Sequence, residues 1–446
     1  MTGIKRILLE CTGTYKTEVN TGIQRVVRNI IKESQTIGKD LEVKCLPVIS
    51  RHSRLWKVDK VAGYHGQLWN NFIIYLKNVY KNFCSLLYAI FPFRPVGRFL
   101  FPAPERFGLS SIIRTVFHIA ILPTTLILYF CRRKINPRKG DLLLMLDSSW
   151  AYPIWPAVKW AKAKGATVGL VVHDILPITQ PHFFVPDTIE RFQVWFDQAV
   201  DTADFFVTVS QTIHNEVKKY LEFRRPAVNW GDRLDSFKLG SVIDNVIKNG
   251  PVRDELKKIS ENSDKPGIYL TIGTIEPRKN HKYLLDAFDK IWERYPDVCL
   301  CIVGRSGWFS DAILERIRSH PKYRTTLFMF NNLSDTELDY CYNHSKAMIF
   351  PSCAEGFGLP IVEALQHKLP VLASNIPIFK EVGGEFCSYF DINDTYSLIK
   401  MIIDIETKGK MPQIRNPKEY KLPIWKDSCR ELLTKSAALY EKMLFV

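Results

Sequence analysis

The sequence lacks the short motifs and biased segments that mark several broad classes of protein. Its ten cysteines include no Cys-x-x-Cys pair, which favours reduced core thiols in a cytosolic protein. Cys299 and Cys301 fall in an apolar run and are expected on a buried strand. The chain has no low-complexity tract and no repeat beyond a similar layout of its two halves. Its first ten residues are poor in apolar side chains, so we expect no signal peptide there.

One segment of the chain holds few acidic residues, and most of the net positive charge lies in that segment. The formal net charge is +15, and residues 71–140 hold eleven Lys or Arg against one acid, Glu105. This segment is also rich in Phe, Tyr, Leu and Ile, a combination that fits a membrane surface better than a duplex groove. Because no nucleic-acid motif accompanies the charge, we expect no nucleic-acid partner.

The longest uncharged run, residues 115–131, is short for a membrane span. It has 17 residues between basic flanks, whereas a spanning helix needs about 20. Pro123 and His118 weaken a span further. We therefore expect an element that lies in the membrane interface, within residues 84–134. The alternative is a buried core helix in an enlarged N-terminal domain.

The length of 446 residues and a hydrophobic content of 46% predict a globular α/β protein of two domains. Short apolar runs alternate with helical stripes in both halves, most clearly in the second, which predicts parallel sheets with crossover helices. The expected strands are residues 4–9, 142–146, 167–172, 205–209, 268–272, 298–303, 347–350 and 370–373. The expected helices are residues 22–33, 281–295 and 360–368, and a capping box at Ser334 opens another.

These elements predict two Rossmann-like domains that face each other across a ligand-binding cleft. The N-terminal domain is expected at residues 1–245, with an insertion at about 52–139. A linker at residues 246–265 leads to the C-terminal domain at 266–424. Residues 425–446 are expected to form a final helix.

The segment Glu355-Gly-Phe-Gly-Leu-Pro-Ile-Val-Glu363 is the strongest functional signal. It joins an expected strand to a helix whose free N–H groups suit a phosphate. Gly356 and Gly358 would let the backbone approach a ligand closely. Glu355 could accept hydrogen bonds from sugar hydroxyls, and Glu363 from a second pair, such as those of a ribose. The alternative is a glycine-rich turn with an acidic helix start.

A second signal, Gly273-Thr-Ile-Glu-Pro-Arg-Lys-Asn280, follows the first strand of the C-terminal half. Arg278 and Lys279 are adjacent cations at the carboxyl end of a strand, where a diphosphate would need neutralising. A solvated turn is the alternative. The two segments reinforce each other because strand ends of one parallel sheet converge on one cleft.

With these segments in order, the sequence resembles a family 4 retaining glycosyltransferase of the GT-B fold. It is similar to bacterial mannosyltransferases of surface polysaccharide synthesis (O-antigen, capsule or exopolysaccharide). The run from Ser374 to Gly384, the segment Val172-His-Asp-Ile-Leu-Pro177 and Thr208-Val-Ser210 match as well. The resemblance covers most of the chain except the insertion.

The resemblance implies a role for each matching residue of the C-terminal half. Glu355 would contact the hydroxyls of the donor sugar as a catalytic residue, and Glu363 would bind the ribose. Arg278 and Lys279 would clamp the diphosphate. Backbone amides for the sugar and phosphates would come from Phe357, Gly358 and Leu359.

In the N-terminal half, the resemblance implies that His173 lies beside the transferred sugar as a second catalytic residue. Gly22 would lie near the phosphates, although many relatives carry two glycines there and Gly13 is a second candidate. Some relatives carry Arg where this chain has Thr274, which leaves that work to Arg278 or Arg305. Trp425 resembles the start of the family's last helix, which crosses back to the N-terminal domain.

The expected reaction is hexose transfer without a metal or other cofactor, because no Asp-x-Asp motif occurs in the sequence. Family membership implies retention, with front-face attack and the departing phosphate taking the acceptor's proton. GDP-mannose is the favoured donor. A lipid-linked glycan acceptor and a place on the inner face of the plasma membrane, as a cytoplasmic peripheral protein, are expected. The alternatives are a non-catalytic scaffold or nucleotide-sugar binder and a nucleotide-sugar epimerase.

Overall fold

The computed structural model describes most of the chain outside the basic segment. The described residues are 3–17, 21–58, 61, 134–240, 250–260, 267–409, 411–412, 415–421 and 424–444. Residues 84–133 of the predicted membrane-associating segment lie outside them. No helix within the described ranges is long and apolar enough to cross a membrane.

The N-terminal domain is built on one sheet with the strand order β4-β3-β2-β1-β5-β6-β7-β8. Its strands are β1 (Arg6–Glu10), β2 (Lys44–Arg51), β3 (Arg54–Lys57), β4 (Lys134–Ile135), β5 (Asp141–Met145), β6 (Thr167–Val172), β7 (Phe205–Thr208) and β8 (Leu234–Ser236). The pairs from β2 through β1 to β8 are parallel, whereas β3 and β4 add an antiparallel edge. Strands β3 and β4 belong to the predicted insertion at residues 52–139. Part of that insertion therefore pairs with the sheet, which the sequence did not predict.

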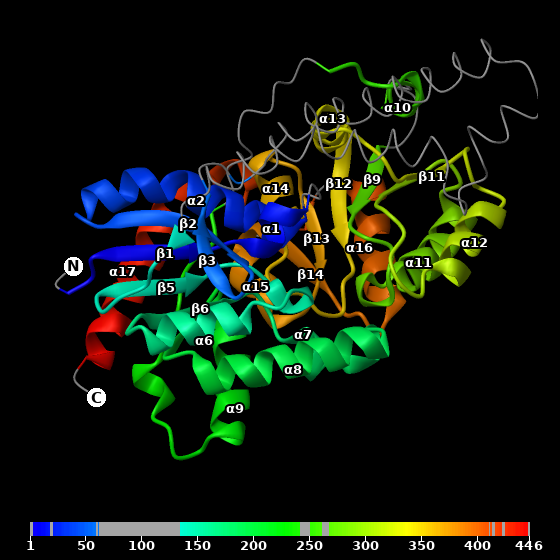
Figure 1. The fold of residues 1–446 in the computed structure, drawn as a ribbon. Coiled ribbons are helices and arrows are strands. Elements are labelled where there is room, and N and C mark those ends of the chain that lie inside the picture. Colours follow the sequence, from blue (N-terminus) through cyan, green and yellow to red (C-terminus); the bar gives the residue numbers. More distant parts are fainter. Residues whose placement is uncertain are drawn as a thin grey trace, which may run out of the picture.

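Helices pack against this sheet and connect its strands (Figure 1). They are α1 (Thr12–Lys16), α2 (Gly22–Asp40), α6 (Trp155–Ala163), α7 (Leu176–Thr179), α8 (Pro186–Thr202) and α9 (Gln211–Arg224), with short 3-10 turns at Ser149–Ala151, Pro181–Phe183 and Trp230–Asp232. A capping box at Thr21 and Gln24 fixes the start of α2. The helix runs seven residues beyond the predicted end because its apolar stripe continues through Ile37.

The C-terminal domain has a fully parallel sheet in the order β11-β10-β9-β12-β13-β14. Its strands are β9 (Ile268–Ile272), β10 (Cys299–Val303), β11 (Leu327–Phe330), β12 (Ser345–Phe350), β13 (Val371–Ser374) and β14 (Cys387–Phe390). Cys299 and Cys301 are buried on β10, as predicted. Apolar clusters cover both faces of this sheet, which is typical of a doubly wound domain.

The helices of this domain are α10 (Asp254–Ser260), α11 (His281–Arg294), α12 (Asp311–Ser319), α13 (Asp335–His344), α14 (Leu359–Gln366), α15 (Pro377–Gly383) and α16 (Thr395–Lys408). Short 3-10 turns lie at Pro277–Lys279, Gly384–Phe386 and Pro417–Glu419. The predicted capping box is confirmed, since Ser334 and Glu337 exchange both of its hydrogen bonds at the start of α13.

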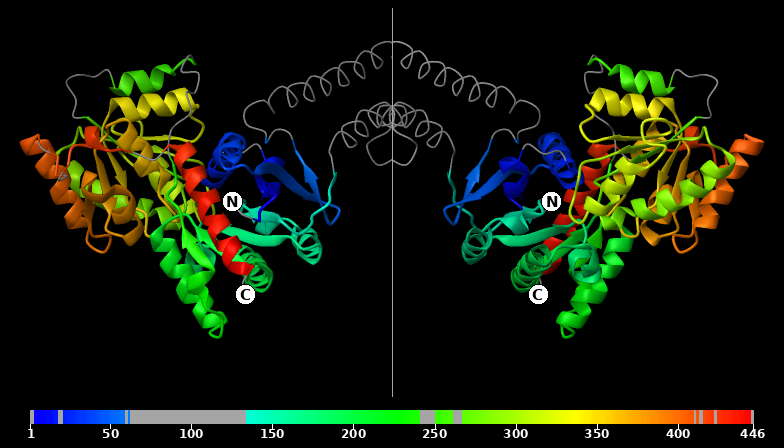
Figure 2. Two further views of the ribbon diagram at one scale, coloured as in Figure 1. Left: turned by 90° about the vertical axis from the view of Figure 1, so that its left-hand side faces the viewer. Right: turned by 90° about the vertical axis from the view of Figure 1, so that its right-hand side faces the viewer.

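The final helix, α17 (Trp425–Met443), returns to the N-terminal domain, where both ends of the chain lie (Figures 1 and 2). It packs against α2 and β7. Leu432 and Leu433 are fully buried in the core of the N-terminal domain, together with Ile30 of α2. The helix therefore supports α2, whose first turn reaches the cleft between the domains.

Further hydrogen bonds among the described residues join the two domains. Trp308 donates its indole N–H to the carbonyl oxygen of Phe183 at 2.8 Å. Glu381 of α15 accepts hydrogen bonds from the backbone N–H groups of Gln211 and Thr212 at 2.6 and 2.7 Å, at the start of α9. These hydrogen bonds can exchange partners with a ligand or with water, and the rings of Phe184 and Trp308, 5.6 Å apart, add an aromatic contact beside them.

The packing of α17 predicts the effect of truncating one of its buried side chains. We expect Leu433→Ala to lower the free energy of unfolding by about 2–5 kcal/mol, because it leaves a cavity in the N-terminal core. The exposed Lys426→Ala on the same helix should change it by about 0.5 kcal/mol or less. Denaturant unfolding of both variants measures this difference, and equal stability of the two would contradict the packing.

Candidate active site

A large cleft lies at the carboxyl ends of both sheets, with a volume of about 1440 Å³. It receives residues that follow β5, β6 and β7 of one domain and β9, β10 and β12 of the other. All nine residues predicted to form the site line it: Gly22, His173, Arg278, Lys279, Glu355, Phe357, Gly358, Leu359 and Glu363. The structure thus brings them together, while the role of each remains a prediction.

The loop from β12 to α14 owes its shape to two glycines. Gly358 caps α14 with a φ of 95°, and a Cβ there would lie 2.9 Å from the ring of Phe379. A Cβ on Gly356 would lie 2.8 Å from the carbonyl oxygen of His173 in the other domain. The sequence predicted close approach to a ligand, whereas the atoms that these glycines accommodate belong to the protein.

Glu355 lies between two cations at the base of the cleft. Its Oε2 is 2.6 Å from Nη1 of Arg278, and its Oε1 pairs with Lys279. Arg278 also contacts Glu276 at 2.7 Å and donates to the carbonyl oxygen of Ala354 at 2.8 Å. Only 9% of the Glu355 side chain is exposed. These charges come from the ends of the neighbouring strands β9 and β12, which explains their convergence.

The cluster sets the ionisation of its members. Burial opposes the charge on Glu355, but Arg278 and Lys279 outweigh it and lower the pKa of Glu355 to about 2. Burial lowers the pKa of Lys279 below its ordinary value, although the negative charge of Glu355 acts to raise it. Glu355 is therefore ionised at neutral pH, ready to accept hydrogen bonds, and the cations beside it can turn to another anion.

His173 follows β6 and is nearly buried. Its Nε2 lies 2.8 Å from the carbonyl oxygen of Leu146, which can only accept, so Nε2 carries the proton. Burial lowers the pKa of His173, although the bond to Leu146 opposes this. The ring is thus neutral at pH 7, and Nδ1 is a hydrogen-bond acceptor without a partner among the described residues.

Glu363 lies one turn into α14 and has two partners that the sequence did not predict. Its Oε1 pairs with the guanidinium of Arg25 from α2, and its Oε2 accepts a hydrogen bond of 2.8 Å from the hydroxyl of Tyr342. Arg25 stands three residues after Gly22 in the same helix. One sequence signal could have identified Arg25. It is a basic residue in the first turn of a helix that is expected to begin at the cleft.

The first turns of α2 and α14 lie against each other. A Cβ on Gly22 would be 3.3 Å from Leu359, the first residue of α14. Both helix starts bring free N–H groups and partial positive charge to one end of the cleft. Gly13, the second candidate glycine, lies instead against Asp147 and is absent from the cleft lining. Thr274 and Arg305 do line the cleft.

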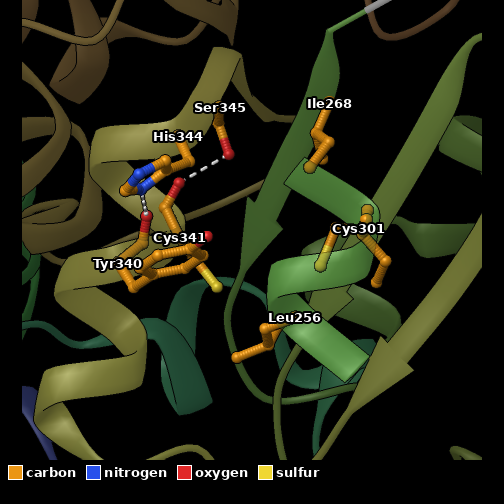
Figure 3. A pocket seen from close by; sticks show the side chains of 8 residues that line it. Leu256, Ile268, Cys301, Tyr340, Cys341, His344 and Ser345 are labelled. Carbon is orange, nitrogen blue, oxygen red and sulfur yellow. Dashed lines mark hydrogen bonds between the residues drawn. The ribbon is translucent and has the colours of Figure 1, made fainter. Parts of the chain in front are cut away.

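A second hollow, beside the outer face of the C-terminal sheet, is too small for a substrate (Figure 3). Its volume is about 10 Å³, which is about the space for one water molecule. Leu256, Ile268 and Cys301 wall one side, opposite Tyr340, Cys341, His344 and Ser345. The cleft between the domains is therefore the candidate active site.

Comparison with known proteins places part of the chain in a described family. Residues 252–421 match the family model of the glycosyl transferases group 1. This chain contains a glycosyl transferases group 1 domain. That domain carries the Glu355 cluster and Glu363, and thus the C-terminal wall of the cleft.

Two curated relatives of this chain are mannosyltransferases by name, and one of the two names mentions O-antigen. Serotype-specific mannosyltransferase WbdA of Escherichia coli is 34% identical over 256 residues, 56% of this chain and 31% of WbdA. O-antigen chain mannosyltransferase B of E. coli is 29% identical over 239 residues, 52% of this chain and 59% of that protein. The chain thus spans about a third of the first relative. The predicted resemblance to mannosyltransferases of surface polysaccharide synthesis is confirmed.

A solved structure extends the likeness to both domains. The E. coli trehalose-6-phosphate protein bound with UDP-2-fluoro glucose aligns with 99% of this chain and 98% of its own. The TM-score is 0.55 at 11% sequence identity, a likeness that shows the fold alone. The predicted GT-B fold is therefore confirmed.

The buried charges predict how acid affects stability. The carboxyl of Glu355 has a pKa of about 2 when folded and of about 4.3 when unfolded. Its stabilising contribution is therefore complete above about pH 4.3 and is lost as the pH falls toward 2. We expect Glu355→Gln to cost about 3 kcal/mol at pH 7, because it leaves two buried cations without their anion.

The cost of Glu355→Gln should shrink by about 1.4 kcal/mol per pH unit below about pH 4.3. Urea unfolding from pH 7 to the lowest pH at which the protein stays folded measures it. Glu315→Gln, at an exposed carboxylate of α12, is the control and should show no such trend. Equal stability of Glu355→Gln and the parent protein at pH 7 would refute the buried cluster.

Proposed function

We propose that this protein is a retaining glycosyltransferase that moves a hexose from a nucleotide-activated donor to an acceptor. The observation that carries the proposal is the buried Glu355 carboxylate between Arg278 and Lys279, at the base of a cleft between two Rossmann-like domains. The mannosyltransferase names of its relatives support it, as does the nucleotide sugar bound in the similar solved structure.

In this proposal, the diphosphate of the donor binds the two cations that pair with Glu355. Arg278 and Lys279 turn to the phosphate oxygens, and the amides of Phe357, Gly358 and Leu359 at the start of α14 add to them. The α2 helix start at Gly22 faces the same point. Glu355 then accepts hydrogen bonds from hydroxyls of the donor sugar, so every charged group exchanges one partner for another.

His173 is assigned to the transferred sugar in the same proposal. Because its neutral ring offers Nδ1 as an acceptor, it would receive a hydrogen bond from a sugar hydroxyl and fix the orientation of the hexose. The protein groups at the base of the cleft stabilise the charge that develops on the leaving diphosphate.

The transfer step breaks the bond between the anomeric carbon and the phosphate oxygen. The acceptor hydroxyl attacks from the face that the phosphate leaves, and its proton passes to the departing phosphate. The anomeric configuration is thereby retained. Two cations and two helix starts supply the positive charge, which supports the predicted independence of metal ions and cofactors.

GDP-mannose is the proposed donor. Besides the names of the relatives, two acidic residues of α13 that line the cleft, Asp335 and Asp339, support a guanine base. A carboxylate can accept the adjacent N–H groups of guanine, whereas uracil and thymine offer only one such donor. The similar structure with UDP-2-fluoro glucose makes UDP-sugars the natural comparison.

The acceptor and the location of the protein belong to the same proposal. A lipid-linked glycan fits the relatives whose names mention the O-antigen chain. Attachment to the inner face of the plasma membrane through residues 84–134 stays a prediction, because nearly all of this segment lies outside the described residues.

A panel of GDP-, UDP- and dTDP-sugars tests the donor. We expect GDP-mannose to raise the Tm of the purified protein and to be hydrolysed slowly, and Glu355→Ala to lose both effects. Glu315→Ala is the matched control and should behave as the parent protein does. If no sugar nucleotide or nucleoside diphosphate changes the Tm, the scaffold alternative is favoured. Conversion of the donor to an epimeric sugar nucleotide would favour the epimerase.

His173 should affect turnover and not nucleotide binding. We expect His173→Ala to lower kcat by about 10²-fold, because the hexose loses a contact that orients it, and to leave the Kd for GDP unchanged. His173→Gln, which keeps an acceptor atom, should recover part of the rate. Because burial lowers the pKa of His173, the parent rate should show no titration near pH 6.5. A matching loss of GDP affinity would contradict the assignment.

A further inference from the structure

Both oxygens of Glu363 already have partners in the cleft. Arg25 pairs with Oε1 and Tyr342 donates to Oε2. Only 4% of the Glu363 side chain is exposed, so water contributes little to its solvation. Because so little of this carboxylate is exposed, a ribose that reaches both of its oxygens must displace one of the two protein groups that cover it.

Arg25 is the group that can leave. Tyr342 is 2% exposed within the C-terminal domain, and its ring stacks on His367 with centroids 4.9 Å apart and planes 8° from parallel. The Arg25 side chain is 31% exposed and belongs to the other domain. A guanidinium on a flexible stem moves at little cost, whereas a buried stacked phenol is fixed.

The pairing of two helices shows where Arg25 would go. Gly22 faces Leu359, and one turn further along each helix Arg25 faces Glu363. One turn is a rise of about 5 Å. A donor with its diphosphate at the start of α14 and its ribose at Glu363 would therefore lie along Arg25. Its phosphate oxygens would be within reach of that side chain.

We propose that Arg25 is a donor-binding residue that exchanges Glu363 for the diphosphate when the nucleotide binds. This inference rests on the proposed function. Ribose hydroxyls replace the guanidinium on Glu363, and the guanidinium gains phosphate oxygens with which it forms strong charge-assisted bonds. Neither the buried carboxylate nor the guanidinium is left without a partner, which would be costly for the buried group.

The test compares a ligand that has phosphates with one that has none. Calorimetry would give the Kd of GDP and of guanosine for the parent protein and for Arg25→Ala. We expect Arg25→Ala to bind GDP about tenfold more weakly or worse, because a phosphate contact is lost. Guanosine should bind equally well or more tightly, since its ribose no longer competes with Arg25 for Glu363.

The decisive quantity is the affinity for GDP divided by the affinity for guanosine. We expect this ratio to fall by about tenfold or more in Arg25→Ala. Lys39→Ala removes a positive charge from the exposed far end of the same helix, outside the residues that line the cleft, and should leave the ratio within about twofold. Equal losses for both ligands would make Arg25 a structural support for Glu363. Equal gains in affinity for both ligands would mean that Arg25 only blocks the ribose site. Either result overturns the proposal.

Two provisions keep the test decisive. If Arg25→Ala does not fold, Arg25→Gln allows the same comparison with an uncharged side chain of similar length. UDP and uridine serve as a second pair of ligands, in case the base is not guanine. If the folded parent protein binds neither GDP nor UDP, the proposed function fails. Loss of the phosphate preference in Arg25→Ala alone confirms the exchange.

Discussion

Glu355, buried between Arg278 and Lys279, is the interaction on which the cleft depends. The two cations come from the end of β9 and the carboxylate from the end of β12, so the cluster exists only when these neighbouring strands are in register. Each charge is tolerable because the others compensate it. A ligand that enters must replace these partners one for one, which favours a molecule with an anionic part beside several hydroxyls. A sugar nucleotide has both.

Much of this arrangement could be predicted from the sequence because its causes are local. Apolar runs that end in glycine predicted strands such as Ile268–Ile272 with the bounds that the structure shows. The capping box at Ser334 predicted the start of α13. The convergence of Glu355 with Arg278 followed from one rule, that parallel strands end at one edge of a sheet. The alternation of strands and helices, together with the family motifs, was enough to predict the GT-B fold.

Other features could not be predicted because they depend on how distant elements pack. Arg25 and Glu363 are 338 residues apart, and their pairing follows from the contact of two helix starts across the cleft. The tautomer of His173 is set by a carbonyl oxygen on the neighbouring strand end. The edge strands β3 and β4 carry no strong apolar pattern of their own; β3 pairs with the edge of β2, and β4 in turn pairs with β3.

Several contacts between the domains are polar, like those of the active site, although the rings of Phe184 and Trp308 also lie 5.6 Å apart across the interface. Arg25 with Glu363, Trp308 with Phe183, and Glu381 with the start of α9 are all hydrogen-bonded. An apolar interface would resist opening, because separation would expose its surface to water. Polar partners can bond to water or to a ligand instead, so the free energy of closure depends on what occupies the cleft. The groups that would recognise the donor are thus among those that hold the domains together, and this couples binding to closure.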